Sequence, residues 1–199
     1  SQRGAGPGGS DETYEPIARG AVAGRVEGDP GARVRIFEFS DFQCPFCRDF
    51  HEEVAPLLRA EFVETGEASI EYWPVDVLGP DSRRANEAAL CAADQNLFWE
   101  MHDILFLRQT RSQNDGAFSR DRLKEYAREI EDAVGGFDLG RFDACLDSGQ
   151  KGAEVEALTR QAQAAGITST PSVIIGSELI RGLNPIDRYR EAIRRAAGP

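Results

Sequence analysis

The spacing of hydrophobic residues along this chain changes several times, and each change marks an expected boundary between strand and helix. A nearly continuous apolar run over residues 33–40 predicts a buried strand, and residues 68–75 predict a second strand that ends at a proline. Between them, apolar residues recur every three to four positions over residues 45–64. This spacing predicts a helix, and Pro56 inside it is expected to introduce a kink.

The middle of the chain has a helical pattern throughout. Helices are expected over residues 82–95, 97–108, 119–132, 138–147 and 152–165. Two short apolar runs over residues 172–176 and 178–182 then predict a hairpin. The dipeptide Asn184-Pro185 predicts the start of a final helix, with the asparagine as its cap and the proline in its first position.

The order of these elements is βαβ, a block of helices, and then ββα, which predicts an α/β fold with an inserted all-helical domain. We expect a flexible segment over residues 1–15, an α/β domain over residues 16–80 and 166–199, and the helical insertion over residues 81–165. No signal peptide is visible, and no run approaches the roughly 18 apolar residues of a membrane span. We expect that a signal or membrane anchor was removed upstream of this Gly-rich start.

The charge of the chain narrows its possible partners. The 199 residues carry a net charge of −11, and 41% of them are hydrophobic, which is enough for a sizeable core. An acidic protein is poorly suited to bind nucleic acid or an anionic membrane surface. We therefore expect no binding to nucleic acid, and we separately expect the protein to be a monomer.

The main candidate for chemistry is Cys44-Pro45-Phe46-Cys47, which follows the first strand and begins the first helix. The start of a helix carries partial positive charge and free N–H groups, so it stabilises a thiolate. Two thiols three positions apart can close a small disulfide and reopen it. The motif therefore indicates dithiol–disulfide exchange, with the first cysteine as the nucleophile.

Two alternatives remain for the same pair, an inert disulfide and a structural zinc site. Zinc normally requires four ligands, and His51 is the only histidine nearby in the sequence, so we expect no metal. We expect no organic cofactor, because a disulfide itself carries two electrons. His51 is interpreted as a surface residue, and His102 as a packing or capping residue.

The other two cysteines, Cys91 and Cys145, lie in expected helices of the insertion. The short spacing of Cys44 and Cys47 makes those two one pair, which leaves Cys91–Cys145 as a structural disulfide. An even cysteine count with such a pair favours an oxidising compartment. Three alternatives stay open: two buried free thiols, a redox relay to Cys44, and a reduced cytosolic protein with four thiols.

These features together resemble the thioredoxin fold with a helical insertion, and within it the DsbA-like group of extracytoplasmic thiol–disulfide oxidoreductases. The resemblance covers about residues 30–197. It rests on residues 39–47, which end in the CPFC motif, on residues 92–103 in the helical block, and on residues 166–172, which contain Thr170-Pro171.

The resemblance implies a role for each residue of the motif. Cys44 is expected to be exposed and to attack, and Cys47 to be covered by the helix and to resolve the mixed disulfide. Pro45 fits the first helical turn without loss of a hydrogen bond. Many DsbA-like proteins carry histidine where this chain has Phe46, and its positive character helps to stabilise the thiolate. Phe46 cannot do this, so we expect it to affect the pKa of Cys44, which should be lowered only to about 5–7.

Two further positions follow from the same comparison. Alternation along the strand puts Glu38 on the face of Ile36, where burial should raise its pKa. The resemblance implies that this acid moves the proton of Cys47; the alternative is a glutamate that reaches solvent. The resemblance also implies a cis peptide bond before Pro171, and the alternative is an ordinary trans turn. It further implies that the backbone of Thr170 pairs with an extended substrate.

The function that the resemblance implies is oxidation of reduced, unfolded secreted proteins outside the cytoplasm. A membrane quinone-linked partner, either DsbB-like or similar to vitamin K epoxide reductase, would reoxidise the cysteine pair. Two other functions remain open. One is a disulfide isomerase or reductase with the same site, and the other is a non-catalytic module that binds peptides.

Overall fold

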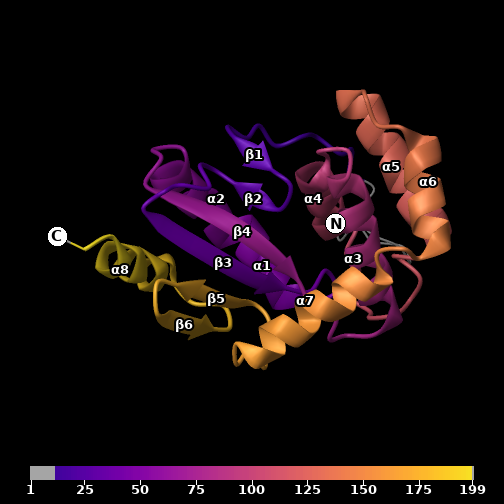
Figure 1. Cartoon of the computed structure of the whole chain (residues 1–199). Coiled ribbons are helices and arrows are strands. Elements are labelled where there is room, and N and C mark those ends of the chain that lie inside the picture. Colours follow the sequence, from indigo (N-terminus) through magenta and orange to yellow (C-terminus); the bar gives the residue numbers. More distant parts are fainter. Residues whose placement is uncertain (1–11, 199) are drawn as a thin grey trace, which may run out of the picture.

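A six-stranded mixed sheet forms the centre of the computed structural model, which describes residues 12–198 (Figure 1). Its strands lie in the order β1-β2-β4-β3-β5-β6, with β3 and β4 parallel and all other neighbours antiparallel. The bounds are β1 Val22–Ala23, β2 Val26–Glu27, β3 Val34–Ser40, β4 Ala68–Pro74, β5 Ser172–Ile175 and β6 Glu178–Arg181. The predicted strands and hairpin agree with β3 to β6 within one or two residues at each end.

The helices also follow the predicted order. The segment between β3 and β4 comprises α1 Pro45–Asp49, η1 Phe50–Val54, α2 Ala55–Leu58 and η2 Arg59–Val63. The helical block comprises α3 Pro80–Ala93, α4 Phe98–Leu107, α5 Arg120–Val134, α6 Leu139–Ser148 and α7 Gly152–Ala164, and the chain closes with α8 Ile186–Ala197. This order is that of a thioredoxin fold with helices inserted before the hairpin, as the sequence predicted.

The helix expected over residues 45–64 contains two wider turns. The segments η1 and η2 have π-helical hydrogen bonding, and Pro56 lies in the first turn of α2 between them. Proline has no N–H to continue an α-helical ladder, so the ladder must change at this point. The helix accommodates Pro56 through these π-helical turns.

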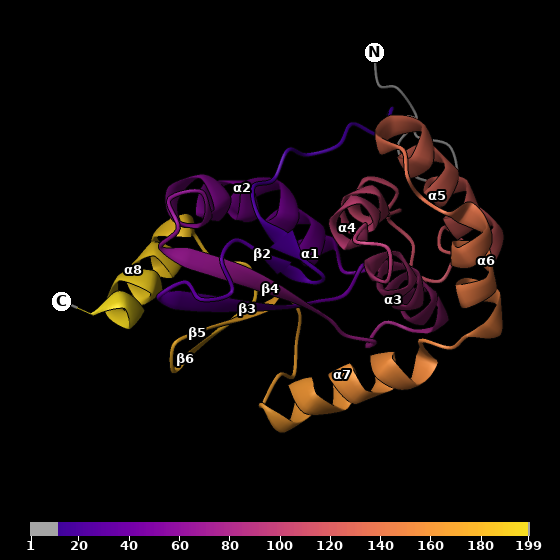
Figure 2. The same ribbon diagram turned by 45° about the horizontal axis from the view of Figure 1, so that its top comes forward.

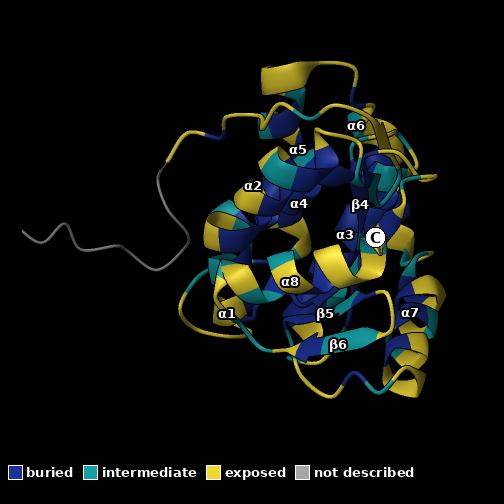
Figure 3. Cartoon of the chain, turned by 90° about the vertical axis from the view of Figure 1, so that its left-hand side faces the viewer, coloured by how far each residue is buried: buried dark blue, intermediate teal, exposed yellow. Residues whose placement is uncertain are grey.

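The two faces of the sheet are covered by different helices. Ile36, Glu38 and Tyr72 lie on the face that carries α1 and α2, together with Tyr189 of α8. Phe39 lies on the opposite face in a smaller cluster with Ala162 of α7. Figure 2 shows α1 and α2 above the sheet and α7 below it. In Figure 3 the exposed residues of α7 and α8 are on the sides turned away from the sheet.

The largest hydrophobic cluster contains residues of both the sheet and the helical block. It contains Ile36 and Tyr72 of the sheet, Phe106 of α4 and Leu123 of α5, all nearly inaccessible to solvent. The division into an α/β domain and an inserted helical domain stays a prediction. Among the helices of residues 12–198, none is sufficiently long and apolar to cross a lipid bilayer.

The N-terminal segment differs in part from the expectation of flexibility over residues 1–15. Residues 1–11 lie outside the described part of the chain. Tyr14 is only 6% exposed and belongs to the hydrophobic core, and the backbone carbonyl of Glu12 accepts a hydrogen bond from Arg108 at 2.8 Å. The expectation is therefore wrong for residues 12–15, because an aromatic side chain there finds a site in the core.

The start of the last helix also differs from the expectation. Pro185, with ψ of 146°, is the N-cap of α8, and its carbonyl accepts the N–H of Arg188. Asn184 instead donates its side-chain N–H groups to the carbonyls of Arg181 and Gly182, at 2.9 and 3.0 Å. The predicted asparagine cap is wrong, because Asn184 closes the end of the β5–β6 hairpin.

Cys91 of α3 and Cys145 of α6 are joined by a disulfide, with their Cα atoms 5.9 Å apart. The bond closes a loop with a sequence separation of 54 residues. Both residues lie in the hydrophobic core. A crosslink of this span restricts the unfolded chain and thereby favours the folded state.

We expect the double substitution Cys91→Ala and Cys145→Ala to lower the free energy of unfolding by about 3 kcal/mol, because the unfolded chain regains the freedom that the crosslink removes. Urea denaturation of both proteins, each with Cys44–Cys47 oxidised, measures this difference. An unchanged midpoint would show that the disulfide does not stabilise the fold.

Candidate active site

The CPFC motif lies where β3 ends and α1 begins. Cys44 is the N-cap of α1, with extended backbone angles, and Pro45 occupies the first turn. The Cys44 carbonyl accepts the N–H groups of Cys47 and Arg48 at 3.1 and 3.2 Å. Proline is tolerated here because the first N–H groups of a helix have no partner within it. The sequence therefore places both sulfurs within the first turn of one helix.

Both cysteines are buried, although to different extents. Cys47 has no exposed surface, as expected, but Cys44 is only 6% exposed, so the expectation of an exposed Cys44 is wrong. The Cys44 thiol donates a hydrogen bond to the Thr170 carbonyl at 3.4 Å. The Gln109 side chain donates to the Cys44 carbonyl at 3.0 Å. Thr170 and Gln109, both distant in sequence, thus contact Cys44.

The pKa values of the two thiols are shifted in opposite directions. Hydrogen bonds that stabilise the thiolate lower the pKa of Cys44 to about 6, despite partial burial. The Cys47 thiol has the largest effect, and the side chain of Thr170 and the N–H groups of Phe46 and Cys47 add to it. Burial raises the pKa of Cys47 well above its usual range, and its hydrogen bond to Cys44 adds to the effect. Near neutral pH, Cys44 is therefore a thiolate and Cys47 a thiol, which is the arrangement that disulfide exchange requires.

Phe46 and Pro45 form the outer surface of the motif. Phe46 is 59% exposed, a large fraction for an aromatic side chain, and Pro45 is exposed beside it. The chain thus presents an apolar surface directly next to Cys44, and this surface is available to another molecule.

The Thr170–Pro171 peptide bond is cis, and it precedes β5 next to Cys44. Thr170 also lines a groove of about 290 Å³ between α7 and the segment that follows β4, and the apolar side chains of this groove are Val75, Val77, Ala162 and Ile167. Val77 at its edge is 51% exposed. An extended peptide that reaches Cys44 would therefore pass both the Thr170 backbone and this groove.

Glu38 lies on β3 and points into the core, where it is 3% exposed. Burial raises its pKa to about 8, and its Oε1 atom has no hydrogen-bond partner among the described residues. Tyr72 of β4 is paired with Glu38 of β3 in the sheet. Burial raises the pKa of Tyr72, and so do the nearby charges of Glu38 and Cys47. The buried acid and the buried thiol thus share one region beneath α1.

Sequence reasoning missed Asp41, which organises the turn before the cysteines. Its Oδ1 accepts hydrogen bonds from the Gln43 N–H at 2.8 Å and the Ser82 hydroxyl at 2.6 Å. Its Oδ2 accepts the N–H groups of Val77 and Leu78, both at 3.1 Å. Its place directly after a strand was the only available signal, because Ser82 and residues 77–78 come from a different part of the chain.

We expect Asp41→Asn to lower the free energy of unfolding by about 2 kcal/mol, because an amide NH₂ would face backbone N–H donors that need an acceptor. Urea denaturation measures this loss. Ser82→Ala, which removes a single donor, should lower stability by about 1 kcal/mol. Equal effects of the two substitutions would contradict the assigned role of Asp41.

His51 is half-buried, which contradicts the expectation of a surface residue. Its ring stacks on Phe106 with centroids 5.0 Å apart and meets the His102 ring edge-on at the same centroid distance. Burial lowers the pKa of His51 to about 3. His102 lies within the aromatic core, in agreement with a packing role.

Comparison with known sequences identifies relatives along most of the chain. A model of a thioredoxin family matches residues 21–195. Disulfide bond formation protein D of Bacillus subtilis is 23% identical over 179 residues, which cover 85% of this chain and 75% of that protein. The Na⁺/H⁺ antiporter NhaA of Herminiimonas arsenicoxydans is 32% identical over 157 residues, or 79% of this chain. The match spans only 23% of the length of that antiporter.

Solved structures have the same architecture. BdbD of Bacillus subtilis superposes with a TM-score of 0.79 at 22% identity, covering 88% of this chain and 93% of BdbD. DsbA of Chlamydia trachomatis superposes with a TM-score of 0.72 at 24% identity, covering 97% of this chain and 95% of that one. The chain is thus similar in fold to BdbD and DsbA. Because the family model matches most of its length, the chain belongs to the thioredoxin family.

Proposed function

We propose that this protein oxidises dithiols of other proteins and thereby introduces disulfides into reduced, unfolded secreted proteins. The observation that carries the proposal is the contrast between the two thiols, with the pKa of Cys44 lowered to about 6 and that of Cys47 raised. A stable thiolate favours the reduced form of the pair. The oxidised pair is correspondingly a strong acceptor of electrons.

In the proposed reaction, a client thiolate attacks Cys44 Sγ of the oxidised pair. The Cys44–Cys47 bond breaks, a mixed disulfide forms, and Cys47 leaves as a thiolate that takes up a proton. A second client thiolate then attacks the client sulfur of the mixed disulfide and releases the Cys44 thiolate. The client gains a disulfide, and its two electrons remain on the enzyme dithiol. Cys47 resolves those mixed disulfides whose client offers no second thiol.

Glu38 is proposed to exchange the proton of Cys47. It is buried on β3 beneath the helix that carries both cysteines, and its pKa of about 8 lets it hold or release a proton near neutral pH. A buried thiolate without a nearby acid would be costly to form. Glu38 thus supplies the proton where water does not reach.

Thr170, Pro171 and Phe46 are proposed to bind the client. The backbone of Thr170 lies beside Cys44, and an extended peptide can pair with it as an added strand. The exposed ring of Phe46 and the groove next to Thr170 are mainly apolar, which suits unfolded chains that expose hydrophobic side chains. The client is thus held by backbone pairing and by apolar contact.

The cellular setting is proposed as well. The Cys91–Cys145 disulfide suits an oxidising compartment, so we place the protein outside the cytoplasm as a monomer. Each cycle leaves a dithiol that an oxidant must renew. We propose a membrane quinone-linked partner for this step, either DsbB-like or similar to vitamin K epoxide reductase.

The reduction potential of the Cys44–Cys47 pair, measured against glutathione, tests this proposal. We expect a value between about −270 mV, that of a reductase, and about −120 mV, that of a strong oxidant, because the Cys44 thiolate is stabilised to an intermediate extent. A value at or below about −270 mV would instead indicate a reductase. A reduced client protein should also regain its disulfides in the presence of the oxidised enzyme. A client that does not refold faster than the buffer control would contradict the oxidase assignment.

A further inference from the structure

The two histidines of the chain are 51 positions apart in sequence but adjacent in the fold. The structure brings the His51 ring of η1 and the His102 ring of α4 to a centroid distance of 5.0 Å. One ligand atom each of His51, His102 and Asp103 lie within 4.8 Å of one another. Two nitrogens bound to one tetrahedral Zn²⁺ are about 3.3 Å apart, so these ligand atoms lie at most about 1.5 Å further apart than a shared ion requires.

His102 is held in a fixed orientation. Its Nδ1 is 2.9 Å from Asp103 Oδ1, and Arg19 donates two hydrogen bonds to the same carboxylate at 2.6 and 2.7 Å. A carboxylate on one ring nitrogen fixes the tautomer and leaves the lone pair of the other nitrogen free to bind a ligand. Metal-binding histidines in proteins are usually oriented in this way.

The second ring nitrogen of His102 has no hydrogen-bond partner in the described part of the protein, although the residue is only 3% exposed. A buried polar atom without a partner is unfavourable by about 1–3 kcal/mol, so its presence at a fixed position requires an explanation. The nearest other imidazole is that of His51. A ligand shared by the two rings would satisfy this nitrogen.

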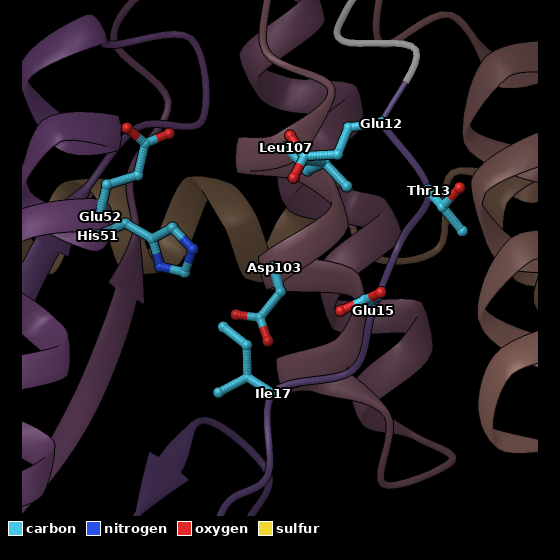
Figure 4. Close-up of a pocket in the computed structure, with 8 residues that line it drawn as sticks. All are labelled: Glu12, Thr13, Glu15, Ile17, His51, Glu52, Asp103 and Leu107. Carbon is cyan, nitrogen blue, oxygen red and sulfur yellow. The ribbon is translucent and has the colours of Figure 1, made fainter.

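A pocket of about 760 Å³ that opens to solvent lies beside His51 and Asp103 (Figure 4), and the buried His102 adjoins these two residues without lining the pocket. His51 and Asp103 line it, and further carboxylates surround them: Glu12, Glu15 and Glu52. The positive charge of Arg19 is balanced by Asp103 and Glu27. Arg59 shares Glu27, and Arg48 pairs with Glu52, so Glu12 and Glu15 leave the pocket with a negative net charge that would attract a cation to the exposed side of His51.

We propose that His51 and His102 form a site for a divalent transition-metal ion of the Zn²⁺ class. Imidazole nitrogens suit Zn²⁺, Cu²⁺ and Ni²⁺ better than Mg²⁺ or Ca²⁺. The two rings supply the nitrogen ligands, Asp103 orients His102, and water with the carboxylates of the pocket completes the coordination. This site is separate from the cysteine pair and departs from the sequence expectation of no metal, which considered only His51.

The experiment uses tag-free protein with the Cys44–Cys47 disulfide closed, so that no active-site thiolate competes for metal. Titration with ZnCl₂ is followed by calorimetry and by the NMR signals of the two imidazole rings. We expect one Zn²⁺ per chain and a shift of both ring signals. His51→Phe should weaken binding by about 100-fold or more, while its ring can still stack on Phe106.

Glu53→Gln is the control. Glu53 is a carboxylate two positions from His51, like those that line the pocket, but it borders a different groove. It should bind Zn²⁺ like the parent protein. Unshifted ring signals, or equal Zn²⁺ binding by the parent and His51→Phe proteins, would overturn the proposal. Neither the ring signals of the parent protein nor Zn²⁺ binding by His51→Phe requires a substitution of the buried His102. The test therefore holds even if such a substitution prevents folding.

Discussion

Replacement of Cys44 by serine is expected to abolish disulfide transfer completely. Serine cannot form a disulfide, and its hydroxyl stays protonated where the thiol of Cys44, with a pKa of about 6, ionises. Refolding of a reduced client protein, followed by the recovery of its activity, should fall to the rate without enzyme. The Cys91–Cys145 disulfide is separate from this site, so the variant should keep its fold and thermal stability.

Replacement of Cys47 by serine provides the matched control, because it removes the other sulfur and keeps the nucleophile. When a client cysteine is supplied as a disulfide with glutathione, the Cys44 thiolate of this variant should attack the client sulfur and release the glutathione thiolate. The resulting mixed disulfide should persist, visible as a mass increase equal to that client, because no Cys47 thiol is present to resolve it. Full activity of Cys44→Ser would contradict the enzyme assignment and favour a module that only binds peptides. A mixed disulfide at any other cysteine would contradict the role of Cys44.

The second large effect concerns the buried carboxyl of Glu38. Burial raises its pKa from 4.5 in the unfolded chain to about 8 in the folded protein. Between these two values the unfolded chain releases a proton that the folded protein retains. The stability of the folded protein therefore falls as the pH rises through this window, and it levels off above pH 8.

Glutamine has nearly the same shape as protonated glutamate and does not ionise. Glu38→Gln should therefore match the parent protein near pH 4 and exceed its stability by about 4–5 kcal/mol at pH 9. Urea denaturation of the oxidised proteins at several pH values tests this difference. Glu53→Gln, which removes an exposed carboxyl, should change stability by less than about 0.5 kcal/mol at every pH. A pH-independent difference for Glu38→Gln would contradict its raised pKa.

Local patterns were sufficient to predict most of the secondary structure. The strand at Val34–Ser40 and the helices from Pro80 to Ala164 have regular apolar spacing, and that spacing depends on near neighbours alone. The errors arose at polar or terminal positions. Asn184 has the composition of a helix cap but bonds to the hairpin, and Tyr14 is packed by residues far along the chain.

For the candidate site, the sequence by itself determined the chemistry. Cys44 and Cys47 on one helical turn, Glu38 on the buried face of a strand and a proline after Thr170 all depend on local spacing. Only the tertiary structure decided what surrounds them. Long-range contacts join segments 36 to 65 positions apart: the hydrogen bond from Gln109 to Cys44, three of the four hydrogen bonds to Asp41, and the contact of His51 with His102. Such contacts depend on how the helical block docks on the sheet, and the periodicity of a single segment carries no information about that docking.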